Sequence, residues 1–369
     1  MIFSYRKRFN VWTLFLGLLL FFHFPLASSA QDSSETRLIA FVDGFFRLNA
    51  PTSGRGGGQT FLYNHDSEAR PALNLVLLGI EHRTSRWRTA LKLQAGTYVN
   101  DNYSDELPAL RPIHEARIGC ALNKKSNLWL DAGLFASHIG FESAISADNA
   151  TLSRSLLAEN SPYYETGLRL QYVPNHKLET NLLLLTGWQS ILPVSRSTLP
   201  ALGTQLLYKK GDWLVNWSSF TGTLYPDSTR RLRFFQNVYA QRNWRDVLQF
   251  TLGFDVGAEQ TQKRATNYHW WYSPVLLIRY QTTTRWKYCL RGEWYRDSQG
   301  VVVASPSGVG FSTFGWSFNA DYQAANNLLV RAELRQLRSN GADFIRASGF
   351  SNHQLSLLAS VSWRINRSI

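Results

Sequence analysis

Residues 128–167 read LWLDAGLFASHIGFESAISADNATLSRSLLAENSPYYETG and contain two strand-like segments on either side of a long insert. Apolar residues alternate with other residues over positions 128–136, and a period of two resumes after the insert, as in β-strands with two different faces. Within the insert, Asp148 or Asn149 can cap a helix over residues 151–159. The stretch therefore predicts two strands joined by a long loop that carries its own short helix.

The N-terminal end of the chain has the parts of a secretory signal. A basic segment at residues 6–8 precedes an apolar segment at residues 11–24, and small residues follow up to Ala30. We therefore expect residues 1–30 to be a signal peptide that is cleaved after Ala30, and residues 31–369 to form the folded domain. An uncleaved anchor is the alternative, but the apolar segment is short for a membrane span.

Strand-like segments recur through the rest of the chain, with short turns and long loops in alternation. The segment at residues 86–99 shows the pattern well, because Trp87, Leu91 and Leu93 alternate with polar or small residues. We count about sixteen such segments of about ten residues each, which is the pattern of an outer-membrane barrel. The predicted fold is all-β: a closed antiparallel up-and-down transmembrane β-barrel of about 16 strands, with the 151–159 helix in its third long loop.

Aromatic residues are abundant, with 13 Trp, 16 Tyr and 22 Phe. They gather near the ends of predicted strands, which suits the two aromatic belts that flank the membrane core. The core of a soluble sandwich is the alternative. The aromatic residues that we assign to the belts are Trp87, Tyr98, Trp188, Trp213, Trp244, Trp270, Trp286, Trp294 and Trp363.

The formal net charge is +13, of which the signal segment contributes three basic residues. On the polar faces of the predicted strands, basic residues outnumber acidic ones. We hypothesise that these faces line a water-filled lumen whose positive field favours anions. The alternative is that the charges pair across strands and leave no net selectivity. The strand residues that we predict to line the pore are Arg88, Lys92, Arg117, Asp131, Arg169, Arg291, Arg331 and Arg335.

The loop at residues 138–162 is the candidate constriction. Leu152, Leu156 and Leu157 form an apolar stripe that must pack against another surface, such as the inner wall or other loops. If the loop folds into the barrel, Arg154 or Glu159 is expected to face the pore. An exposed surface helix is the alternative.

No catalytic, metal or cofactor site is predicted. Ser137, His138, Glu142 and Ser143 are the candidates for a hydrolase site, but their spacing shows no triad and no nucleophile-elbow motif. His138 is better interpreted as a hydrogen-bonded wall residue. The histidines and the two cysteines, Cys120 and Cys289, do not show metal-ligand spacing. An exported chain meets little nucleic acid, so we expect no nucleic-acid partner.

Four motifs resemble those of a known family. They are 94–100 (QAGTYVN), 128–133 (LWLDAG), 138–143 (HIGFES) and 155–164 (SLLAENSPYY), and they resemble the OmpL-like β-barrel porins. The resemblance is densest over about residues 63–188. It implies a Gram-negative outer-membrane barrel with a porin-like role, and it does not supply a substrate. The chain departs from many such barrels in ending on Ile369 rather than on an aromatic residue.

Together these observations predict an outer-membrane porin for the passive diffusion of small hydrophilic solutes. The expected partners are outer-membrane lipid and those solutes, and a homo-oligomer is compatible with the sequence. The alternatives are a barrel enzyme, such as an outer-membrane lipid hydrolase, and a barrel whose long loops bind a surface partner.

Overall fold

The computed structural model describes residues 34–50 and 59–369, and the compact unit begins at Ser34. The predicted signal peptide, residues 1–30, lies outside the described residues. Within them, no helix is long and apolar enough to cross a membrane.

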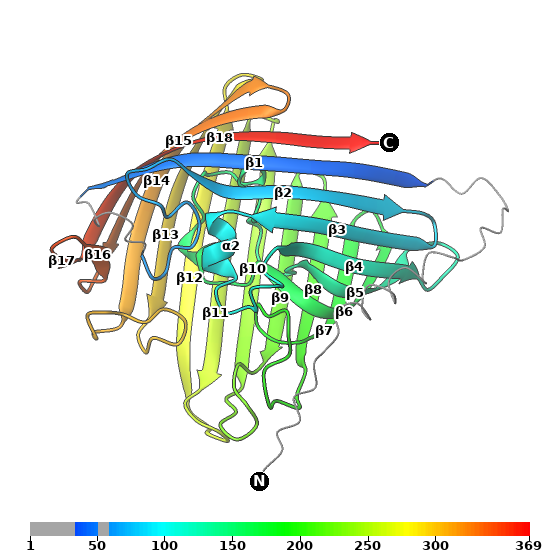
Figure 1. Ribbon diagram of the computed structural model, residues 1–369, viewed down its shortest axis with the longest axis horizontal. Coiled ribbons are helices and arrows are strands. Elements are labelled where there is room, and N and C mark those ends of the chain that lie inside the picture. The colour runs from blue at the N-terminus through cyan, green and yellow to red at the C-terminus, as the bar shows by residue number, and fades with distance from the viewer. Residues whose placement is uncertain (1–33, 51–58) are drawn as a thin grey trace, which may run out of the picture. The chain divides into compact units, whose positions relative to one another are not determined.

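The described chain forms a closed antiparallel barrel of sixteen strands, which confirms the predicted fold class. Each strand pairs with its neighbours in sequence, and β1 pairs with β18 to close the ring (Figure 1). The barrel strands are β1 (Glu35–Ala50), β2 (Ala72–Arg83), β3 (Trp87–Ala95), β4 (Ile113–Ala121), β5 (Leu128–Ala136), β6 (Tyr164–Asn175), β7 (Leu178–Leu185), β8 (Ala201–Lys210), β9 (Trp213–Gly222), β10 (Arg233–Trp244), β11 (Leu248–Gln260), β12 (Tyr268–Gln281), β13 (Trp286–Asp297), β14 (Phe311–Ala325), β15 (Leu328–Ser339) and β18 (His353–Ser368).

The two faces of each strand differ as the alternation predicts. On β13, Leu290 is 55% exposed, whereas the adjacent Arg291 and the next residue but one, Glu293, are 2% exposed. Exposed apolar side chains on one face and buried polar side chains on the other reverse the usual arrangement of a soluble sheet. The arrangement is the one expected of a barrel whose outer face contacts lipid.

Seven of the nine predicted belt aromatics lie on strands of the barrel, and two do not. Trp87 and Trp270 are among the most exposed, as a lipid-facing position requires. Tyr98 is fully buried in a helix, and Trp188 packs edge-on against Phe220 inside the barrel. The assignment of Tyr98 and Trp188 to the belts was therefore wrong, because both follow the ends of their strands and turn inward.

A helix replaces the end of the third predicted strand. β3 ends at Ala95, and α2 (Thr97–Asn102) follows, where the alternation predicted a strand up to residue 99. Gly96 adopts a φ of 128°, and a Cβ there would lie 2.4 Å from the carbonyl oxygen of Asn74. This residue can therefore approach the neighbouring strand only as glycine, and it ends β3.

The helix in the third long loop exists but is shorter than predicted. α3 (Leu156–Glu159) has Ser155 as its N-cap, and the Ser155 side chain accepts a hydrogen bond from the Ala158 amide. A 3₁₀ turn, η1 (Ser146–Asp148), precedes it. The intervening backbone makes hydrogen bonds to the barrel wall instead of helical ones, and local propensity could not reveal this competition. A small extra hairpin, β16 (Phe344–Arg346) with β17 (Gly349–Ser351), lies in the loop before β18.

Candidate functional site

The inner wall of the barrel carries two clusters of charged side chains. The β3–β6 cluster consists of Arg88, Lys92, Glu115, Arg117, Asp131 and Arg169. The β13–β15 cluster consists of Arg291, Glu293, Asp321, Arg331, Glu333 and Arg335. All eight strand residues predicted to line the pore belong to one of these two clusters.

Asp131 lies at the centre of the β3–β6 cluster. Arg88 donates two hydrogen bonds to its carboxylate, at 2.6 and 2.5 Å, and Arg169 donates two to Oδ2, at 3.0 and 2.8 Å. Arg117 lies 3.8 Å from Oδ1. Lys92 bridges Glu81 and Glu115, at 2.6 and 2.7 Å. Adjacent strands place these groups side by side, so their register alone brings them together.

Asp131 and its three basic partners differ in exposure. The Asp131 side chain is 0% exposed, whereas those of Arg88, Arg117 and Arg169 are 10%, 17% and 19% exposed. The carboxylate is therefore covered by three guanidinium groups. Around Asp131, the guanidinium groups rather than the carboxylate therefore remain partly exposed.

The β13–β15 cluster is almost completely buried. Arg291 pairs with Glu333 at 2.8 Å and with Glu293 at 3.3 Å, and Arg335 pairs with Glu293 at 2.8 Å. Arg331 pairs with Asp321 at 2.7 Å. These six side chains are at most 3% exposed. Buried ion pairs of this kind require further hydrogen bonds to compensate for lost hydration.

The β5–β6 loop, residues 137–163, supplies those hydrogen bonds. Arg291 donates to the carbonyl oxygen of Ser153 at 2.8 Å, and Glu333 accepts from the Ser153 amide at 2.6 Å. Glu293 accepts from the Leu156 amide at 2.6 Å. Arg331 donates to backbone carbonyls of the same loop at positions 146 and 149. The arginines of the β13–β15 cluster therefore hold the loop.

These contacts run across the interior of the barrel. The loop leaves β5 and returns to β6, while α3 contacts β12 and β13, which are six or more strands away in the ring. At the start of the loop, Nε2 of His138 donates a hydrogen bond to the carbonyl oxygen of Ser219 on β9, at 2.8 Å. The apolar loop residues Ile139 and Leu156 join a buried cluster with wall residues such as Phe220. The loop thus packs against the inner wall rather than lying on the surface.

Arg154 and Glu159, the two loop residues predicted to face the pore, are buried. Arg154 is fully buried and donates to the carbonyl oxygens of Leu152 and Ala144, at 3.2 and 2.7 Å. Glu159 accepts from the Tyr63 amide at 2.8 Å. Both side chains therefore hold loop backbone in place in this structure.

The described part of the β1–β2 loop, residues 59–71, packs against the β5–β6 loop. Asp43 on β1 joins them, because it accepts from Ser146 at 2.7 Å and lies 2.9 Å from Nε2 of His65. Asp66 accepts from Arg47 at 2.7 Å and from the Gln59 amide at 2.6 Å. No sequence motif predicted a role for these residues. An apolar pair in a long polar loop, Phe61 and Leu62, was the available signal, and both are buried in the interior.

Several carboxyl groups in these loops titrate far from their ordinary range. Burial raises the pKa of Glu159 to about 7, although the Tyr63 amide and Asn64 oppose the shift. Burial likewise raises the pKa of Asp66 to about 7 against the opposing effect of Arg47. Burial also raises the pKa of Glu142, whose carboxylate accepts from Ser155. The loop assembly therefore contains groups that change charge near neutral pH.

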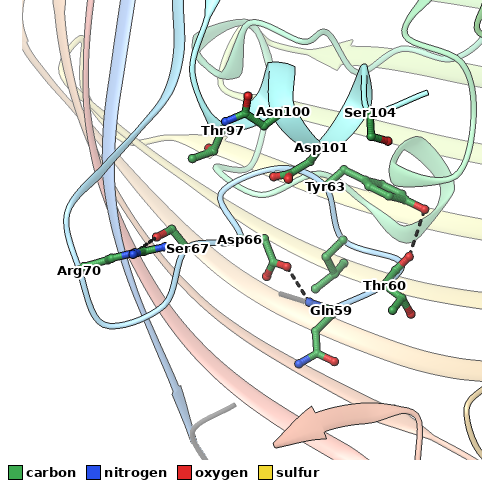
Figure 2. A pocket seen from close by; sticks show the side chains of 11 residues that line it. Gln59, Thr60, Tyr63, Asp66, Ser67, Arg70, Thr97, Asn100, Asp101 and Ser104 are labelled. Carbon is green, nitrogen blue, oxygen red and sulfur yellow. Dashed lines mark hydrogen bonds between the residues drawn. The ribbon is translucent and has the colours of Figure 1, made fainter. Parts of the chain in front are cut away.

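A pocket of about 460 Å³ lies between the β1–β2 loop and α2. Figure 2 shows Asp66 and Tyr63 on one side of it and Thr97 and Asp101 on the other. Its lining is mostly polar, and burial raises the pKa of Asp101 to about 6. This pocket is a polar recess between two long-loop segments.

The Ser137–His138 pair does not have the geometry of a hydrolase. Both side chains bond to the same carboxylate, because Ser137 donates to Glu165 at 3.0 Å and Nδ1 of His138 lies 2.7 Å from it. Activation of a serine requires a base nitrogen on its hydroxyl group. Among the described residues, no three His, Cys, Asp or Glu side chains are grouped so that they could hold a metal ion.

The structure is a closed sixteen-stranded barrel with a lipid-facing outer wall, a charged inner wall and a third long loop that folds inward. These features define the class of outer-membrane β-barrel porins. The chain belongs to the family described as "Putative beta-barrel porin-2, OmpL-like", which matches residues 36–364. Among curated proteins, none matches the chain in sequence.

Solved structures with the same fold have little sequence in common with the chain. An anion-selective porin from Comamonas acidovorans superposes with a TM-score of 0.61 at 7% identity, covering 90% of this chain and 100% of that one. OmpF of Salmonella typhi, in complex with daunomycin, gives 0.56 at 11% identity, covering 90% and 98%. The trimer form of OmpT of Vibrio cholerae gives 0.57 at 8% identity, covering 91% and 100%. At these identities the likeness establishes the fold alone.

Proposed function

We propose that the protein is a non-enzymatic outer-membrane pore for the passive diffusion of small hydrophilic solutes, that it favours anions, and that the 138–162 loop narrows its lumen. The main support for the proposal is that the two charged clusters have different roles. The β13–β15 cluster holds the loop inside the barrel, and the β3–β6 cluster presents partly exposed cations on the facing wall.

The narrowing follows from the course of the β5–β6 loop. The loop crosses from β5 to strands β12, β13 and β15 and fills interior space with its backbone and with α3. A solute must then pass through the part of the lumen that the loop leaves open. Among the described residues, the side chains of the β3–β6 cluster make no hydrogen bond or ion pair with residues 137–163, so we place the open part of the lumen beside them.

The anion preference follows from exposure rather than from a count of charges. Lys92, Arg117 and Arg169 remain partly exposed, while Asp131 lies beneath the guanidinium groups. A passing ion therefore first approaches these positively charged side chains, at short range and beside low-dielectric walls. Arg291, Arg331 and Arg335 of the β13–β15 cluster contribute little to this field, because loop carbonyl groups and carboxylates surround them.

The reversal potential across a planar bilayer with a salt gradient tests the anion preference. Wild-type protein is expected to favour chloride over potassium, and the triple variant R88Q/R117Q/R169Q is expected to lose most of that preference. K124Q/K125Q, which removes two exposed charges in the turn before β5, is the matched control and should behave as wild type. A wild-type preference for cations would contradict the proposal.

A further inference from the structure

The outer face of the barrel carries an apolar groove at the long-loop ends of β10, β11 and β12. Its volume is about 250 Å³, and its lining consists of Phe234, Gln236, Val256, Gly257, Ala258, Tyr268 and Trp270. The registers explain its shape. Ala258 on β11 lies opposite Phe234 on β10 and opposite Trp270 on β12, so a small residue lies between two large ones.

This groove lies on the lipid-facing side of the wall. Phe234 and Trp270 are both exposed, and Phe234 packs against Tyr268 with ring centroids 6.0 Å apart. Farther along the same strands and on the same face, Leu252, Phe254 and Leu276 are exposed as well. The groove is therefore continuous with the apolar belt, and an apolar chain can enter it from the membrane without crossing water.

Basic side chains lie directly beyond the groove. The loop between β11 and β12 closes the hairpin whose strands form two of its walls, and it carries the exposed Lys263 and Arg264 (Figure 1). The neighbouring β9–β10 loop carries Arg230 and Arg231, of which Arg231 lies over the ring of Tyr225 at 4.9 Å.

The acidic groups near these cations leave a positive surplus. Asp227 pairs with Arg230 at 3.6 Å, and its backbone carbonyl accepts from Lys263 at 2.6 Å. Glu259, the other nearby carboxylate, lies on the opposite face of β11, where it pairs with Arg233 inside the barrel. Among the described residues, Arg264 makes no ion pair, and its φ of 62° is in the left-handed region that side chains other than glycine rarely adopt.

We propose that this surface binds one phosphorylated lipid of the outer leaflet. An acyl chain lies in the groove over Ala258, and Lys263 and Arg264 bind the phosphate of the headgroup. The groove is open to the membrane core and matches the acyl chain of such a lipid. The cations at the interface beyond the groove match its phosphate headgroup. A soluble anion would use the cations alone, and a neutral lipid would use the groove alone.

Native mass spectrometry of the delipidated barrel with added lipid tests the proposal. Dipalmitoyl phosphatidylglycerol is the anionic probe, and the phosphatidylcholine with the same chains is the zwitterionic control. We expect one tightly retained phosphatidylglycerol, and roughly tenfold or greater loss of its retention in K263Q/R264Q. Phosphatidylcholine should be retained weakly by both proteins.

Two further variants separate the groove from the charges. A258W fills the groove and should reduce retention of phosphatidylglycerol, whereas A332W, at an exposed outward position on β15, should not. Equal retention by wild type, K263Q/R264Q and A258W would overturn the proposal. A complex of two protein copies that A258W abolishes would overturn it as well, because a second copy would then cover the groove.

Discussion

At the scale of residues, Asp131 holds the β3–β6 cluster together. It is completely buried and accepts hydrogen bonds from two arginines while a third lies close by. Removal of one partner from a buried charged network costs far more than removal of one partner from an exposed pair. The same carboxylate also reduces the positive field of the wall. Its replacement should therefore affect both stability and selectivity.

The variant D131N is expected to lower the free energy of unfolding by about 3 kcal/mol, because three guanidinium groups lose their counter-charge. It should also increase the preference for anions in reversal-potential measurements. D148N is the matched control, since Asp148 pairs with Arg364 at 2.8 Å but is 42% exposed, and its cost should stay below about 1 kcal/mol. Urea unfolding in detergent micelles measures both values, and equal costs for the two variants would contradict the assignment.

Whether a residue's role could be predicted from sequence depends on how far apart in sequence the interacting groups lie. Alternation along a strand is a local property, so it was sufficient to predict that Arg88 and Arg291 lie on the inner wall. Their partners depend on registers and on the closing of the ring, as in the contact between Glu293 and the Leu156 amide. Whether the strand candidates line an open pathway stays a prediction.

At the scale of elements, the β1–β2 and β5–β6 loops form one assembly inside the barrel. Buried Glu159 and Asp66 accept backbone amides of the β1–β2 loop, at Tyr63 and Gln59. Burial raises the pKa of both carboxyl groups to about 7, well above the value of about 4 in water. The packed loops therefore bind these protons more tightly than loops in water would.

The sign of the pH dependence follows from that difference. The contribution of these two carboxyl groups to the packing of the loops is fully present below about pH 4 and is lost as the pH rises through 7, because they then ionise. His138 acts in the same direction. Burial lowers the pKa of His138, but the neighbouring Glu165 carboxylate has the larger effect, so the pKa of His138 is raised overall. Its contribution is likewise lost as the pH rises.

Hydrogen exchange of residues 59–66 measures this effect. Once intrinsic exchange rates are taken into account, protection should be greater at about pH 5.5 than at about pH 8.5. The variant D66N/E159Q keeps the hydrogen-bond acceptors and should flatten most of the difference. D105N, at an exposed position beyond α2, should leave it unchanged. Greater protection at the higher pH would contradict the assignment.

The two short helices show where local sequence is insufficient at this scale. The 151–159 segment has good helix propensity, yet Leu152 and Ser153 donate their amides to Asn319 and Glu333 on the far wall. Only α3 remains helical as a result. α2 replaces the end of a predicted strand because Gly96 turns the chain inward, and no pattern in the alternation marks that turn.

At the scale of the whole molecule, the number of strands and their order could be predicted from sequence because short turns and long loops alternate regularly. The direction in which each long loop folds could not, since it depends on which side chains the opposite wall presents. The β13–β15 cluster is that partner for the β5–β6 loop. Arg291, Arg331 and Arg335, which the sequence pattern assigned to the field of the pore, thus fix the position of the loop that we propose as the constriction.

Liposome swelling with sugars of graded size tests the central claim that the barrel is a diffusion pore narrowed by the β5–β6 loop. Wild-type protein should admit small sugars and exclude larger ones. Deletion of residues 150–158 should raise the swelling rate and the size limit, and a deletion of equal length at residues 191–199, in the largely exposed β7–β8 loop, should not. Liposomes that swell no faster with the wild-type barrel than without it would contradict the account.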